Sequence, residues 1–233
     1  MAVLPAGHPF RRHSENLRAV KAGRKQAERA HKSAIRRADA AAIGFTARIH
    51  QLLIGLLAEA QLRVIVNDPD GFNDKERRLL MQERSQQDRW LRAVDFAIRR
   101  HYEILLHYEI DDVRTAPGVT AQYDSLIDIL KNDLASFIQD RNNLAHAQWV
   151  WLLNGKESDF TGAAAEPFNY LALKRRGEVI NETAGLIHVL AVSEPTFQRD
   201  YTRIYGEITA LHATIDGIDY PIFVSELQSR RRD

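Results

Sequence analysis

Apolar residues recur every three or four positions along most of this chain, and this spacing constrains its fold more than any other feature. Glycine and proline, which interrupt helices, number only 12 and 7 among 233 residues. The spacing therefore predicts an all-α fold, a helical bundle. The chain is long enough for one well-buried core with a tail.

Two long helices are predicted in the first half of the chain. Residues 40–66 carry a helical stripe of apolar side chains, and the turn-forming sequence Asn-Asp-Pro-Asp-Gly at 67–71 ends it. Asn73 and Glu76 have the spacing of a capping pair. A second helix is therefore expected from this point to about His107.

A third helix and a small β-hairpin are predicted in the second half. Apolar spacing indicates the helix from about Thr120 to Leu152. After a break in this pattern, residues 170–174 and 178–181 flank Arg176-Gly177 in a way that is typical of a short hairpin. A hairpin is thus expected after the third helix.

The two ends of the chain are predicted to differ from the central region, residues 40–216. A last helix is expected over about 194–215, with Ser193 at its N-cap. Residues 217–233 are interpreted as a tail. Residues 1–39 hold ten Lys/Arg against three acidic residues. Their apolar stripe is thin, so we expect a basic extension whose helix depends on a partner.

The composition excludes several classes of site. Lys and Arg number 32 against 31 for Asp and Glu, so the overall charge says little about partners. The chain has no cysteine, which excludes disulfides and thiolate metal sites and fits a reducing, cytoplasmic location. The longest apolar run is short for a bilayer span and the N-terminus lacks an apolar signal core, so we expect no membrane segment.

One charged residue interrupts the apolar stripe of the third helix. The stripe descends through Leu130, Leu134 and Phe137, and its next position is Arg141. A guanidinium on a core-facing stripe is costly unless it is paired or lines a polar cleft. His146 lies about 140° round a straight helix from Arg141. The two groups could share one target if two copies of the helix crossed about a two-fold axis, which favours a homodimer.

The segment Arg141-Asn-Asn-Leu-Ala-His146, at the end of a long helix and before an aromatic residue, resembles the signature of the HEPN family. Members of that family are all-helical and commonly dimeric, and many are metal-independent endoribonucleases of toxin and antiphage systems. The resemblance covers the motif closely and residues 40–152 in outline. It also implies an antitoxin or a neighbouring defence protein as a possible partner.

The resemblance implies cleavage of RNA by its own 2′-hydroxyl, without a metal or other cofactor. His146 would act as general base or acid, Arg141 would hold the scissile phosphate, and Asn142 would orient His146 or the phosphate. The basic extension could follow RNA phosphates, or it could be a solvated tail. Its candidate RNA-binding residues are Arg24, Lys25, Arg36 and Arg37.

Structural interpretations of the same residues stay open. Arg141 could simply pair with an acid on a neighbouring helix, with Glu59 and Asp95 as candidates. The motif would then belong to a catalytically silent RNA- or protein-binding dimer. Gln148 stands where toxins of the family that are paired with a nucleotidyltransferase carry tyrosine. That difference argues against regulation by nucleotide transfer.

Overall fold

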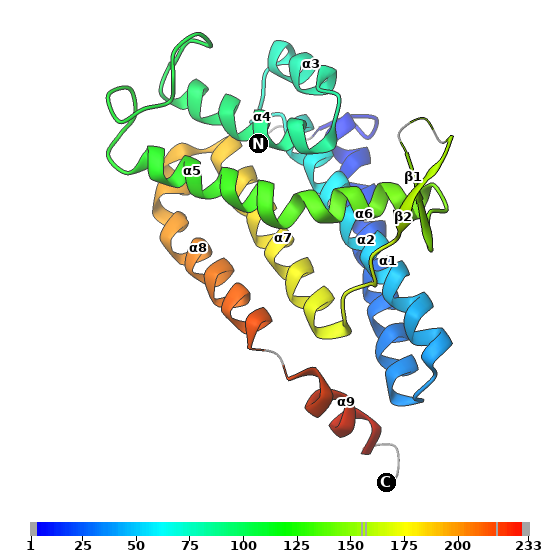
Figure 1. Cartoon of the computed structure of the whole chain (residues 1–233). Coiled ribbons are helices and arrows are strands. Elements are labelled where there is room, and N and C mark those ends of the chain that lie inside the picture. Colours follow the sequence, from blue (N-terminus) through cyan, green and yellow to red (C-terminus); the bar gives the residue numbers. More distant parts are fainter. Residues whose placement is uncertain (1–3, 155, 157, 218, 230–233) are drawn as a thin grey trace.

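The computed structural model describes residues 4–154, 156, 158–217 and 219–229, and it confirms an all-helical fold with one small hairpin (Figure 1). The α-helices are α1 (Pro9–Arg36), α2 (Ala40–Asn67), α3 (Asp74–Gln82), α4 (Gln86–His101), α5 (Val119–Ile129), α6 (Ala135–Ala145), α7 (Tyr170–Val192), α8 (Glu194–Asp216) and α9 (Tyr220–Ser229). A π-helix, η1 (Leu130–Leu134), lies between α5 and α6, and the strands are β1 (Trp151–Leu153) and β2 (Phe160–Ala163).

Helix α2 is the centre of the bundle and packs against α1, α6 and α7 (Figure 1). Its bounds confirm the predicted helix to within a residue, because the apolar stripe is long and Asp39 caps its start by accepting from the amide of Ala42. By length and composition alone, α2 is the one described helix that could cross a membrane.

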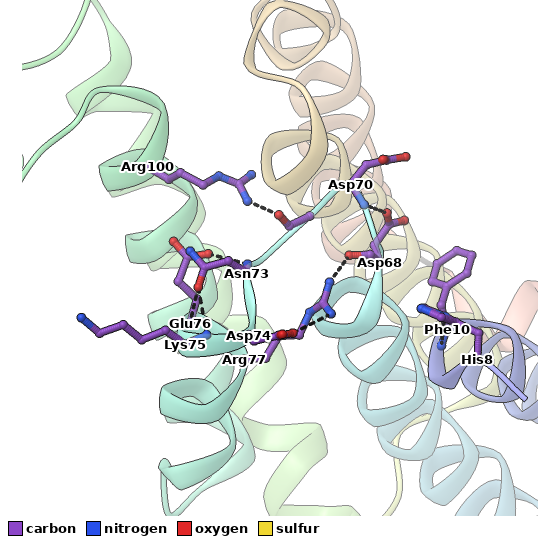
Figure 2. Close-up of polar contacts among 11 residues, drawn as sticks. His8, Phe10, Asp68, Asp70, Asn73, Asp74, Lys75, Glu76, Arg77 and Arg100 are labelled. Carbon is purple, nitrogen blue, oxygen red and sulfur yellow. Dashed lines mark hydrogen bonds and ion pairs between the residues drawn. The ribbon is translucent and has the colours of Figure 1, made fainter. Parts of the chain in front are cut away.

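The turn from α2 to α3 is held by polar contacts (Figure 2). Asn73 and Glu76 form the predicted capping box at the start of α3. Arg77 donates to the carbonyl of Asp68 at 2.8 Å, and Arg100 of α4 donates to the carbonyl of Gly71. These contacts hold the start of α3 and the end of α4 near the end of α2.

The second predicted helix was wrong in its extent, because it is two helices. The chain breaks at residues 83–85, where Ser85 caps α4 by accepting from the amide of Asp88 at 3.0 Å. Helix α4 then ends at His101, well before His107. The break brings Arg84 and the first turn of α4 to the surface beside α2.

The third predicted helix, residues 120–152, is the continuous α5–η1–α6 rod, which ends earlier than expected (Figure 1). At its end Ala147 adopts a left-handed conformation with φ 59°, and the amide of Gln148 donates to the carbonyl of Asn143 at 2.9 Å. This cap turns the chain into β1 and defines the position of His146 at the helix end.

The hairpin follows the motif helix as expected, but its predicted location was wrong. Strands β1 and β2 pair antiparallel, with Trp151 opposite Ala163. Residues 170–181 lie in α7. Gly177 suggested a turn, yet a Cβ there would collide with the guanidinium of Arg24 on α1. This glycine therefore serves close packing between α7 and α1.

The last predicted helix is confirmed as α8, and within the expected tail residues 220–229 form α9. Helix α9 returns to α1, where Gln228 donates to the carbonyl of Ile35 at 3.1 Å. Phe223 stacks on Tyr170 of α7 with ring centroids 5.4 Å apart. The basic helix α1 is thus packed between α2 and α9.

Two histidines are buried where α1 meets α2. His31 and His50 are 1% and 0% exposed, and among the described residues their ring nitrogens have no hydrogen-bond partner. Their ring centroids lie 6.0 Å apart, and the ring of Tyr170 packs on both. Burial lowers the pKa of His31 to about 4 and, together with the charges of His31 and Arg24, the pKa of His50 to about 3.

Candidate functional site

The position of Arg141 is set by the crossing of α2 and α6. A Cβ added at Gly55 would lie 2.7 Å from the carbonyl oxygen of Phe137 and would also collide with the Cβ of Arg141. The two helix backbones therefore touch at this glycine. Arg141 lies on the face of α6 turned toward α2, as the apolar stripe predicts.

The guanidinium of Arg141 is paired within the chain. It forms an ion pair with Glu59 of α2, and its Nη1 donates to the Asn142 side chain at 2.8 Å. Arg63 also donates to Glu59, at 2.8 Å. Asp95, the other acid considered for Arg141, pairs with Arg99 instead.

Glu59 is held in its charged form by its two arginines. Burial alone would raise the pKa of this carboxyl group, but the hydrogen bonds and charges of Arg63 and Arg141 outweigh burial and keep the pKa below its usual value. Glu59 therefore neutralises part of the positive charge in this region at neutral pH.

Arg141 and Asn142 also line an open cavity of about 330 Å³. Its walls come from α2, the end of α3, the start of α4 and α6. Besides Arg141, the cavity is lined by three further arginines and one glutamate, namely Arg63, Arg84, Arg89 and Glu59. Its remaining wall is largely apolar, from Leu62, Val66, Leu80, Met81 and Ile138. The cavity thus combines an apolar floor with a positive rim.

His146 lies apart from this cavity. It is exposed at the end of α6, and in the described part of the chain its side chain makes no hydrogen bond or ion pair. The next residues are used structurally. Gln148 accepts from the amide of Leu153, and Trp149 stacks on Phe45 with centroids 5.8 Å apart. One chain therefore brings Arg141 and Asn142 together but leaves His146 outside the cavity they line.

The four candidate RNA-binding residues of the basic extension differ in their exposure. Lys25, Arg36 and Arg37 are exposed on or just beyond α1. Arg24 is half-buried, and its guanidinium packs beside Gly177 of α7. Arg24 is thus placed to hold α1 on the bundle, whereas the other three are free to meet solvent.

The sequence did not indicate Arg63, Arg84 or Arg89 as site residues. They come from three different elements, and only the packing of α4 against α2 gathers them. The spacing of Ser85 and Asp88 is typical of a helix start. Read in this way, the sequence would have predicted that Arg84 lies in the loop before that helix.

Comparison with known proteins adds no family assignment. The chain matches no protein-family model, and no curated protein or solved structure matches it. Among the described residues no group of three His, Asp or Glu side chains is arranged to hold a metal ion. The resemblance to the HEPN family rests on residues 141–146 and stays a prediction.

Proposed function

We propose that this chain is a metal-independent endoribonuclease of the HEPN type that acts in the cytoplasm as a homodimer. The observation that carries the proposal is the position of Arg141. Its guanidinium lies where α6 faces the core, yet it opens with Asn142 onto a cavity lined by three more arginines. Guanidinium groups suit phosphate oxygens because their planar donors can bind two oxygens at once.

The proposed reaction needs one proton acceptor and one proton donor. The 2′-hydroxyl loses its proton to a base and attacks the neighbouring phosphorus, and the bond to the 5′-oxygen breaks as that oxygen gains a proton. The products are a 2′,3′-cyclic phosphate and a 5′-hydroxyl. His146 is exposed, and imidazole is the side chain that most often serves as general base or acid. Arg141 would stabilise the charge on the phosphoryl oxygens.

In a dimer, the second chain would supply the histidine that lies outside the cavity of the first chain. Since His146 lies outside the cavity, the proposal places His146 of the partner subunit beside Arg141, across a two-fold contact. The biological role that fits such an enzyme is a toxin or an antiphage defence protein, controlled by an antitoxin or a neighbouring protein.

A second candidate function is a catalytically silent RNA- or protein-binding dimer. The ion pair between Arg141 and Glu59 favours it, because this pair alone explains a guanidinium on the core side of α6. In that case Arg141 stabilises the α2–α6 contact. Replacing it would then lower stability without removing any RNA cleavage.

The test is cleavage of RNA by purified protein in EDTA, with the new ends identified. We expect cyclic phosphate and 5′-hydroxyl ends, and loss of cleavage in Arg141→Ala and His146→Ala. His107→Ala is the matched control, since His107 is also exposed but lies outside the motif. Cleavage that survives in both motif variants would refute the nuclease proposal. Binding without cleavage by the unaltered protein would favour the silent dimer.

Mixing the two inactive variants tests the shared site. A mixed dimer of Arg141→Ala and His146→Ala chains would contain one intact site, made of Arg141 from one subunit and His146 from the other. Random mixing should therefore restore about a quarter of the original activity. No recovery, with mixed dimers shown to form, would contradict a site shared between subunits.

A further inference from the structure

The cavity beside Arg141 is also lined by arginines that take no part in the ion pair between Arg141 and Glu59. Arg84 is exposed, and it makes no ion pair among the described residues. Arg89 donates its Nε to the carbonyl of Glu83 at 3.1 Å, and no acid pairs with its guanidinium in the described part of the chain. With four arginines against one glutamate, the lining keeps an excess of positive charge.

Two buried donors of the cavity's lining residues also have no acceptor. The Nε2 of Gln86 and the Nε of Arg141 are shielded from solvent and have no hydrogen-bond partner among the described residues. A buried donor without a partner is costly, so both side chains would gain by turning these donors toward a ligand oxygen in the cavity. Gln86 is the first residue of α4, so amide groups and the positive end of the helix dipole lie at the same place.

The apolar part of the lining suits a flat apolar group. Leu62, Leu80 and Ile138 are buried and close the floor, whereas Met81 at the rim is 48% exposed. The volume of about 330 Å³ is at the lower end of the range for small-ligand pockets. An anion alone would leave the apolar part of this surface unfilled.

We propose that the cavity binds one nucleotide unit, with its phosphate on Arg84 and Arg89 at the start of α4 and its base against Met81 and the apolar floor. The proposal rests on the proposed function for one point, that the nucleotide belongs to an RNA strand next to the cut. A free nucleotide has the same chemistry. Arg84 and Arg89 would then be binding residues that position the substrate for Arg141.

The experiment measures binding separately from cleavage. The protein carrying His146→Ala is titrated with a 2′-O-methyl RNA trinucleotide, which lacks the attacking hydroxyl, and with a nucleoside monophosphate, the parent nucleoside and inorganic phosphate. We expect the two nucleotide probes to bind at least about tenfold more tightly than the nucleoside or phosphate, since both parts of the cavity are then filled. Tighter binding of the trinucleotide assigns the site to RNA, and tighter binding of the monophosphate assigns it to free nucleotides.

Arginine variants locate the phosphate. Arg84→Ala and Arg89→Ala should each weaken nucleotide binding about tenfold, and should reduce the dependence of trinucleotide affinity on salt. Arg78→Ala is the matched control, because Arg78 is exposed on the neighbouring helix α3 and does not line the cavity. Met81→Glu should also weaken binding, by placing a negative charge at the rim.

Equal losses in Arg78→Ala and Arg84→Ala would overturn the proposal, and so would a nucleoside that binds as tightly as its monophosphate. The two proposals fail separately. A protein that binds these nucleotides but never cleaves RNA refutes only the nuclease. A protein that cleaves RNA with unchanged KM in Arg84→Ala and Arg89→Ala refutes only the nucleotide pocket.

Discussion

Replacing Gly55 by alanine should destabilise the fold, although alanine is the better helix former. The added Cβ would lie 2.7 Å from the carbonyl oxygen of Phe137, and would also overlap the Cβ of Arg141. Nonbonded carbon atoms normally sit about 3.5–4.0 Å apart, so α2 and α6 would have to separate by about 1 Å. Such overpacking costs roughly 1–3 kcal/mol, and the gain in helix propensity offsets about 1 kcal/mol of that.

The net loss, up to about 2 kcal/mol in the free energy of unfolding, can be measured by urea denaturation followed by circular dichroism. With a slope of about 2 kcal/mol/M, the midpoint should fall by up to about 1 M. Gly185→Ala is the matched control, because Gly185 lies inside α7 with open space around its Cα. It should gain about 0.5–1 kcal/mol. If both variants gained stability equally, the close contact inferred at the α2–α6 crossing would be refuted.

Ala147→Gly should stabilise the chain by about 1 kcal/mol, because φ is 59° there. Ala210→Gly, inside α8 and exposed, should destabilise it by a similar amount, and urea midpoints check both. Since His31 and His50 have lowered pKa values, the unfolded chain binds protons below pH 6.5 that the folded chain takes up only near pH 4 and 3. The free energy of unfolding should therefore fall as pH drops from 6.5 toward 4, by up to about 1.4 kcal/mol per pH unit for each histidine. His50→Leu should remove its share of this slope, up to about 1.4 kcal/mol per pH unit below pH 6.5, and an unchanged slope would contradict the assignment. Gly177→Ala should cost less than Gly55→Ala, because the flexible end of Arg24 can move aside, and a larger loss would count against this view of the α1–α7 contact.

The elements that could be predicted from sequence are those for which a start or stop signal agrees with the apolar spacing. Residues 40–66 and 194–215 are of this kind, and the structure has both helices within a residue or two of the expected bounds. The segment 170–181 was misassigned because Gly177 was interpreted as a turn. Gly177 is required because the side chain of Arg24 on α1 packs against it. Since α1 is distant in the sequence, no local pattern could indicate this contact.

In the candidate site, too, local patterns indicated some residues, whereas tertiary packing alone brings the others together. The stripe of the motif helix indicated that Arg141 faces the core, and Glu59 was one of two acids considered for it. The other arginines of the cavity could not be found in this way, because α2, α4 and the link before α4 contribute them separately. Their proximity is a property of tertiary packing, whereas the position of Arg141 is a property of one helix.

The π-helix η1 carries a consequence for how such a site could arise or be lost. A π-turn is an α-helix with one extra residue, and it rotates everything beyond it by about 100° relative to an uninterrupted helix. Leu130 and Leu134 remain buried in it, so the core accepts the irregularity. Deleting one residue between them would restore a regular α-helix and leave Arg141 and Asn142 facing α2, whereas straightening η1 without a deletion would turn both residues by about 100°. A relative with an intact motif and a one-residue gap here would therefore keep the position of Arg141.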